Sequence, residues 1–138
     1  MDIRKRILKK LLNFDVTKVS GWNKEKIQTL SLAFYELGYS CWAKSYKTPT
    51  DEMIDKERED LIDKGFFALK KSVEINPEFP TPYSYIGLLY REKIKVDELN
   101  AKKYIELNKE YNEKFVKAYK KLRASAKYRK QQEKELDQ

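Results

Sequence analysis

The side chains that most enzymes use for catalysis are scarce in this sequence. The chain contains no histidine and a single cysteine, Cys41. The absence of histidine removes the commonest general base, the Ser-His and Cys-His nucleophile pairs and the commonest transition-metal ligand. One cysteine cannot form an internal disulfide, which is compatible with the reducing cytoplasm. We therefore expect a cytoplasmic protein that is not an enzyme and that has neither a cofactor nor a bound metal.

A dense group of acidic residues lies between positions 51 and 63. Its members are Asp51, Glu52, Asp55, Glu57, Glu59, Asp60 and Asp63. Metal binding or acid–base catalysis requires such side chains to converge from rigid positions. These residues are instead distributed around one helix and alternate with Lys56, Arg58 and Lys64. The pattern favours a solvated helix face whose charges pair with one another.

A run of positive charge lies near the C-terminus. Between positions 114 and 130 there are eight basic residues and no acidic one, namely Lys114, Lys117, Lys120, Lys121, Arg123, Lys127, Arg129 and Lys130. Their number equals the net charge of the whole chain, +8. Such a segment attracts polyanions, so we expect contact with RNA, DNA, the ribosome, an anionic membrane surface or an acidic protein. A tail that only aids solubility remains the alternative.

Aromatic residues form a second candidate binding surface. They are Tyr35, Tyr39, Trp42 and Tyr46. Because they recur at intervals of four, three and four residues, they form one stripe along a helix. The stripe is compatible with two interpretations, a half-buried core or a groove that binds a peptide.

The elements that carry these residues are predicted to be helices. Four Gly and four Pro provide few of the turns that an all-β fold needs, and apolar residues recur every three or four positions. We expect helices over 24–47, from Pro49 to just before Asn76, from Thr81 to about 95, and from 98 into the 130s. The predicted N-caps are Asn23, Thr48 and Asp97. At 1.5 Å per residue the last helix is roughly 50–55 Å long, so its end must project, bind or fray.

The N-terminal residues predict one further helix. Ile3, Ile7, Leu8, Leu11 and Leu12 share one face over 2–13, with basic residues elsewhere. Three interpretations remain: a helix packed on the core, a helix docked on a membrane or partner, and a mitochondrial-type targeting segment. No apolar run approaches the ~20 residues of a transmembrane helix.

Two segments of the chain resemble each other. They are Phe34-x-x-Leu37-Gly38-x-x-Cys41 and Tyr83-x-x-Ile86-Gly87-x-x-Tyr90. Between them, Gly65-x-x-x-Leu69-x-x-Ser72 is followed by Pro77. A glycine on the inner face of a helix allows a neighbouring helix to approach closely. The pattern resembles the tetratricopeptide repeat (TPR), a helix pair with large residues around a glycine and a closing proline.

This resemblance implies an all-α fold of TPR-like antiparallel helical hairpins, in which first helices line a groove. Ser84, Leu88 and Arg91 would then join the aromatic stripe as a partner groove. The sequence departs from the family at one spacing: Gly38 and Gly65 lie 27 positions apart, against ~12 in the family. Both helices of that hairpin should therefore be about two turns longer. The family's carboxylate clamp is also missing, which argues against recognition of chaperone C-termini.

Together these features predict a helical core over residues 1–112, with hairpins over about 24–110, and a projecting basic extension over 113–138. The expected function is a noncatalytic adaptor that binds a protein partner in the groove, while the basic helix docks on an acidic surface. The alternative is a nucleic-acid or ribosome-binding protein that acts through the basic helix.

Overall fold

The structure, a computed structural model, describes residues 3, 6, 9–10, 13–15 and 21–136. From Gly21 onward the chain forms four long helices: α2 (Lys24–Lys47), α3 (Asp55–Ile75), α4 (Thr81–Lys93) and α5 (Ala101–Leu136). Short 3₁₀ helices, Thr50–Glu52 and Glu98–Asn100, precede α3 and α5. The described part of the chain contains no strand, so the prediction of an all-α fold is confirmed.

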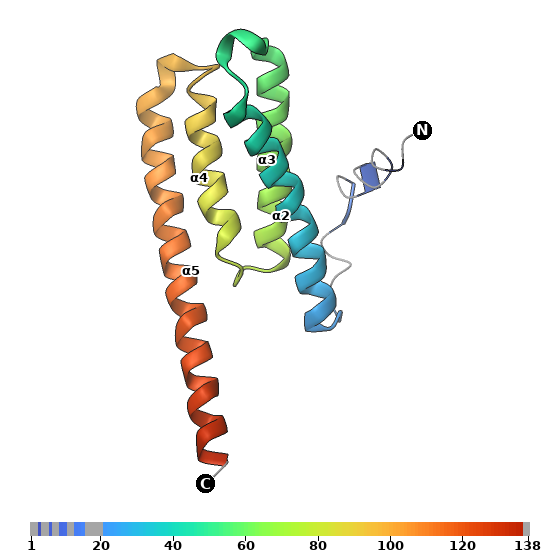
Figure 1. The fold of residues 1–138 in the computed structure, drawn as a ribbon, viewed down its shortest axis with the longest axis vertical. Coiled ribbons are helices and arrows are strands. Elements are labelled where there is room, and N and C mark those ends of the chain that lie inside the picture. The colour runs from blue at the N-terminus through green and yellow to red at the C-terminus, as the bar shows by residue number, and fades with distance from the viewer. Residues whose placement is uncertain (1–2, 4–5, 7–8, 11–12, 16–20, 137–138) are drawn as a thin grey trace.

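The four helices pack as two hairpins. Helix α2 packs along α3, and α4 packs along α5, while α3 and α4 bring the hairpins together. The helices run alternately up and down, and α5 extends far beyond the other three (Figure 1). With 36 residues, α5 is about 54 Å long, whereas α4 has 13 residues and is about 20 Å long. The predicted long last helix is confirmed, and its C-terminal half projects.

Three glycines lie where helices meet. A Cβ atom on Gly38 would come within 2.4 Å of Leu69 Cγ, and one on Gly65 within 2.9 Å of Leu89 Cδ1. A Cβ atom on Gly87 would approach Asn108 Nδ2 to 2.9 Å. A larger residue at any of these positions would push two helices apart. The predicted role of these glycines at helix contacts is therefore confirmed.

The predicted N-cap at Asn23 is confirmed, whereas the predicted N-cap at Thr48 is wrong. The side chain of Asn23 accepts a hydrogen bond from Lys26 N at 2.8 Å and caps α2. The Thr48 hydroxyl instead donates back to Lys44 O at the end of α2, so the predicted N-cap is wrong. Pro49 leads into a 3₁₀ turn, and α3 begins only at Asp55.

Asp97 also differs from its predicted role. Its carboxylate accepts hydrogen bonds from the side chains of Asn100 and Tyr104 and caps no backbone N–H. The chain passes through the 3₁₀ helix before α5 begins, which moves the backbone donors of α5 away from this carboxylate.

The sequence pattern predicts that Arg58 lies on the solvated helix face together with the acidic residues. For Arg58 this prediction is wrong. The seven carboxylates around it are exposed, but Arg58 itself is only 1% exposed. Its guanidinium donates to three carbonyl oxygens at the end of α2, those of Ser45, Thr48 and Pro49. This happens because the first turn of α3 lies beside the last turn of α2.

A buried polar cluster continues from this cap to α4. The Ser45 hydroxyl donates to Glu92 Oε1 at 2.8 Å, and Lys95 forms an ion pair with the same oxygen at 2.7 Å. Ser45 is fully buried and Glu92 is 4% exposed. The cluster therefore fixes the C-terminal ends of α2 and α4 side by side.

Most of the predicted helix over 2–13 lies outside the described residues, including Ile7, Leu8, Leu11 and Leu12. Just after it, Phe14 packs its ring 5.8 Å from that of Trp22 and 6.3 Å from that of the buried Phe34. Within the described part of the chain, no helix is both long enough and apolar enough to cross a membrane.

Candidate functional site

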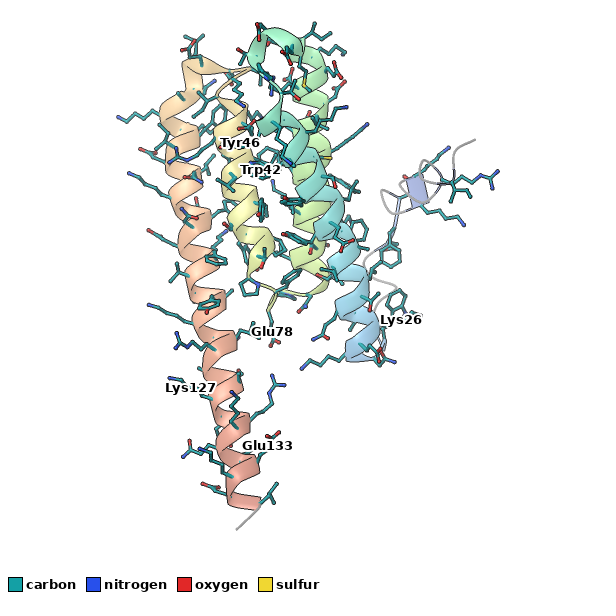
Figure 2. The ribbon with its side chains drawn as sticks, in the orientation of Figure 1. Lys26, Trp42, Tyr46, Glu78, Lys127 and Glu133 are labelled. Atoms are coloured by element: carbon teal, nitrogen blue, oxygen red, sulfur yellow. The ribbon has the colours of Figure 1, made fainter. Side chains whose placement is uncertain are left out.

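The aromatic stripe of α2 meets α4 at a residue that the sequence analysis missed. Tyr35, Tyr39 and Trp42 surround Tyr85, with ring centroids 5.8, 5.2 and 5.1 Å from it. Trp42 also stacks on Tyr46 at 5.0 Å (Figure 2). Burial, followed by the nearby Tyr85 hydroxyl, raises the pKa of Tyr35 to about 12. The stripe therefore contacts α4 through three of its rings, while Tyr46 remains 61% exposed.

The three α4 residues predicted to share this groove are distributed differently. Ser84 and Leu88 are half-buried. The residue of α4 whose ring contacts the stripe is Tyr85. Arg91 instead binds α5, because its Nε donates to Asn108 Oδ1 at 2.9 Å. The structure thus brings the four aromatic residues together but directs Arg91 toward α5.

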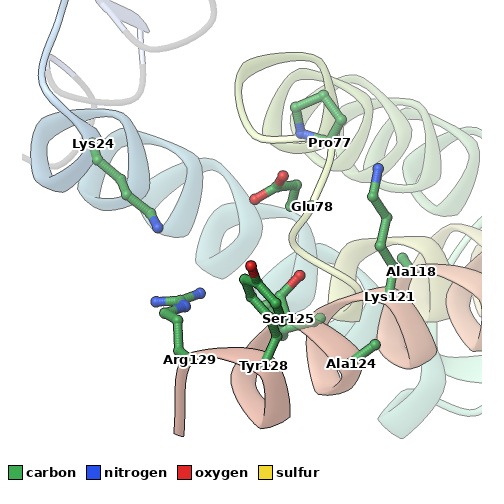
Figure 3. A pocket seen from close by; sticks show the side chains of 10 residues that line it. Lys24, Pro77, Glu78, Ala118, Lys121, Ala124, Ser125, Tyr128 and Arg129 are labelled. Carbon is green, nitrogen blue, oxygen red and sulfur yellow. The ribbon is translucent and has the colours of Figure 1, made fainter. Parts of the chain in front are cut away.

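A second candidate site is a hollow next to the N-terminal end of α4. Its volume is about 700 Å³, and a second hollow of about 310 Å³ adjoins it. The two hollows share Lys24 of α2, Glu78 of the α3–α4 loop, and Leu122 and Arg129 of α5. We call the combined hollow the basal cleft. Its lining comes from the first turns of α2, the α3–α4 loop and the projecting half of α5 (Figure 3).

The basal cleft combines an apolar floor with positive charge. Leu32 and Leu122 are 45% and 42% exposed, and Phe79, Pro80 and Ala118 are among the other apolar residues of the lining. Lysine and arginine side chains are directed into the cleft from both walls (Figure 3). Apolar side chains that are this exposed beside a net positive charge indicate a surface suited to an amphipathic ligand.

The charge balance of the cleft is strongly positive. Lys24 of α2 and Arg129 of α5 point toward each other, Lys121 of α5 rises beside Pro77, and Glu78 is the one carboxylate among the lining residues (Figure 3). Like charges that converge without full compensation repel one another, and a bound anion relieves that repulsion. The cleft is therefore electrostatically suited to an acidic ligand.

The eight basic residues between positions 114 and 130 divide between the faces of α5. Lys114, Lys117, Lys121 and Arg129 line hollows on the cleft side. At about 100° per residue, the other four, Lys120, Arg123, Lys127 and Lys130, point away from the cleft, and each is exposed. The sequence had presented these cations as one surface, whereas the helix separates them into two.

Lys24, Glu78 and Phe79 were missed by sequence reasoning. Nothing local marks them, because they come together only through the short length of α4 and the path of the loop before it. The acidic residues at the start of α3 lie at the other end of the molecule. Among the residues that the structure describes, no three potential Asp, Glu or Cys ligands gather closely enough to hold a metal ion.

We found no protein-family model, characterised protein or solved structure that matches this chain. Its own geometry must therefore indicate its function. In the part of the chain that the structure describes, four long helices pack as hairpins, and a basic cleft lies next to the shortest of these four, α4.

Proposed function

We propose that this protein is a noncatalytic adaptor of the TPR kind, which binds an acidic segment of a partner protein in the basal cleft. The observation that carries the proposal is the composition of the cleft. Lys24, Lys121 and Arg129 line the cleft together with exposed apolar side chains and one carboxylate, that of Glu78. The basic half of α5 extends this surface and docks on the acidic partner.

The packing of the hairpins supports the repeat assignment. Gly38 and Gly65 lie at the contact of α2 with α3 and of α3 with α4, and Gly87 lies at the contact of α4 with α5. These are the positions where the repeat pattern needs a small residue. The first hairpin is longer than in the family, with 24 residues in α2 and 21 in α3, as the wide glycine spacing requires.

A nucleic-acid or ribosome-binding protein is the second candidate. It is favoured by the eight basic residues between 114 and 130, among which no acidic residue occurs. Contacts with phosphates would use cations on every face of α5 and would not need an apolar floor. A protein ligand uses both features of the cleft, and for this reason we favour it.

The two candidates are separated by a matched pair of triple variants. The inward variant replaces Lys24, Lys121 and Arg129 by Gln, and the outward variant replaces Arg123, Lys127 and Lys130 by Gln. Each removes two Lys and one Arg, so both chains fall from +8 to +5. Each variant is immobilised, and the proteins it retains from a cell extract are identified and compared with those retained by the parent chain.

We expect the outward variant to retain the partner of the parent chain and the inward variant to lose it. Binding that falls equally in both variants, and that declines steeply with salt, would favour the nucleic-acid alternative, because counterion release depends on the number of phosphate contacts. Retention by a chain truncated near residue 112 would contradict both candidates.

A further inference from the structure

The basal cleft exists because α4 is shorter than the helices on either side of it. The bond from Ser45 to Glu92 fixes the C-terminal ends of α2 and α4 beside each other. Helix α2 has 24 residues and α4 has 13. Because their C-terminal ends are aligned, the 11 additional residues of α2 extend beyond α4 at the N-terminal end. There α2 continues for about 16 Å beyond the first residue of α4. On the other side α5 continues past the same point (Figure 1).

The walls of this space are two helical ridges. Lys24, Gln28 and Leu32 follow one another at four-residue intervals on α2. Ala118, Leu122 and Ser125, followed by Arg129, form the facing ridge on α5. Ridges at this spacing form the groove into which another helix packs. The loop from Pro77 to Pro80 closes the groove at the end where α4 begins.

We propose that the occupant of the basal cleft is one amphipathic helix of about three turns, contributed by the partner protein and lying end to end with α4. Its length follows from the 16 Å by which α2 extends beyond α4. Its apolar side packs on Leu32 and Leu122, and its carboxylates face Lys24, Lys121 and Arg129. The inference rests on the proposed adaptor function and adds the form and charge of the ligand.

Charge complementarity excludes the chain's own N-terminus as the occupant. Residues 1–12 carry Arg4, Lys5, Arg6, Lys9 and Lys10 but only one acidic residue. A segment of this charge would be repelled by the cations of the cleft. A partner helix that recognises an apolar groove flanked by lysines is acidic on its polar face, with apolar anchors three and four positions apart.

The test uses a display library of random 16-residue peptides selected on the intact protein. A cleft-filling variant, Ser125→Trp, serves for counter-selection, and Ala126→Trp is its control. Both positions are exposed on α5, but only Ser125 lines the cleft. We expect selected peptides to combine Asp or Glu with Leu or Ile at helical spacing and to gain helical circular dichroism on binding.

Synthetic versions of these peptides should bind the parent and Ala126→Trp equally, and Ser125→Trp at least about tenfold more weakly. The helical occupant is overturned if no peptide is enriched, if the enriched peptides are extended or interrupted by proline, or if both Trp variants bind alike. It is also overturned if sedimentation shows that the parent chain pairs with itself and Ser125→Trp does not. If the selected peptides are extended and do not bind the inward variant, the helical form of the ligand is refuted while the proposed adaptor function still stands.

Discussion

The buried guanidinium of Arg58 should make a large contribution to stability, and Arg58→Met tests this. Methionine keeps most of the apolar stem but removes the hydrogen bonds to the end of α2. Two of the carbonyl acceptors, on Thr48 and Pro49, are only part-buried and can be rehydrated. The hydroxyl of Ser45 keeps its hydrogen bond to Glu92, but the buried carbonyl of Ser45 loses its close donor, and an unsatisfied buried group costs about 1–3 kcal/mol.

The expected loss of stability is about 1–3 kcal/mol. The weakened hydrogen bonds to the part-buried carbonyls add to the cost, and removal of the buried positive charge offsets part of it. A domain of this size has a free energy of unfolding of about 5–15 kcal/mol, so the effect is large. It is measured by urea unfolding followed by far-UV circular dichroism. The control is Lys56→Met, which removes the same charge from an exposed position on the same helix and should cost less than about 0.5 kcal/mol. Equal unfolding midpoints for the two variants would refute the capping role of Arg58.

Three further measurements follow from the packing and the titration of the fold. Gly87→Leu should cost roughly 1–3 kcal/mol, because even a Cβ atom would lie 3.2 Å from Asn108 O; a parent-like melting curve would contradict this. Deletion of 124–138 should change the melting temperature by no more than about 2 °C, since every described residue in that range is exposed, and it should abolish partner binding. The hydrogen bond to the Asp97 carboxylate raises the pKa of Tyr104 to about 12. The contribution of this hydrogen bond to stability is therefore complete below pH 10 and is lost as the pH rises toward 12. Because the pKa of Tyr35 is raised to a similar value, urea unfolding at alkaline pH should show a smaller loss in Tyr104→Phe than in the parent, and equal losses would contradict the role of Tyr104.

Periodicity and turn residues were sufficient to predict most of the helices. The spacing of apolar residues located α2, α4 and α5, and Asn23 marked the start of α2 because its short side chain can reach a backbone donor three residues later. The glycine pattern also identified the helix contacts correctly. Thr48-Pro49 misled because it has the same form as Thr81-Pro82, which does begin a helix. Only the first pair is followed by a 3₁₀ turn.

The candidate site was less predictable, since it depends on relations between distant elements. Arg58 has an ordinary sequence environment, and its burial comes from the approach of α2. The basal cleft depends on the difference in length between α2 and α4, together with the position of Phe79 in the connecting loop. The basic residues were recognised from composition, but their division into two faces required the helix geometry of α5.

The separation of charge along the molecule has a consequence for how it approaches other molecules. Exposed carboxylates gather at the turn between α2 and α3, and the cations of α5 lie toward the opposite end (Figure 1). The protein therefore has a permanent electric dipole along its long axis. Near a negatively charged body this dipole experiences a torque that turns the tip of α5 forward. The torque acts over about one Debye length, roughly 8 Å at physiological salt. The first contact is therefore made by the tip of α5, and this preferred orientation weakens as the salt concentration rises.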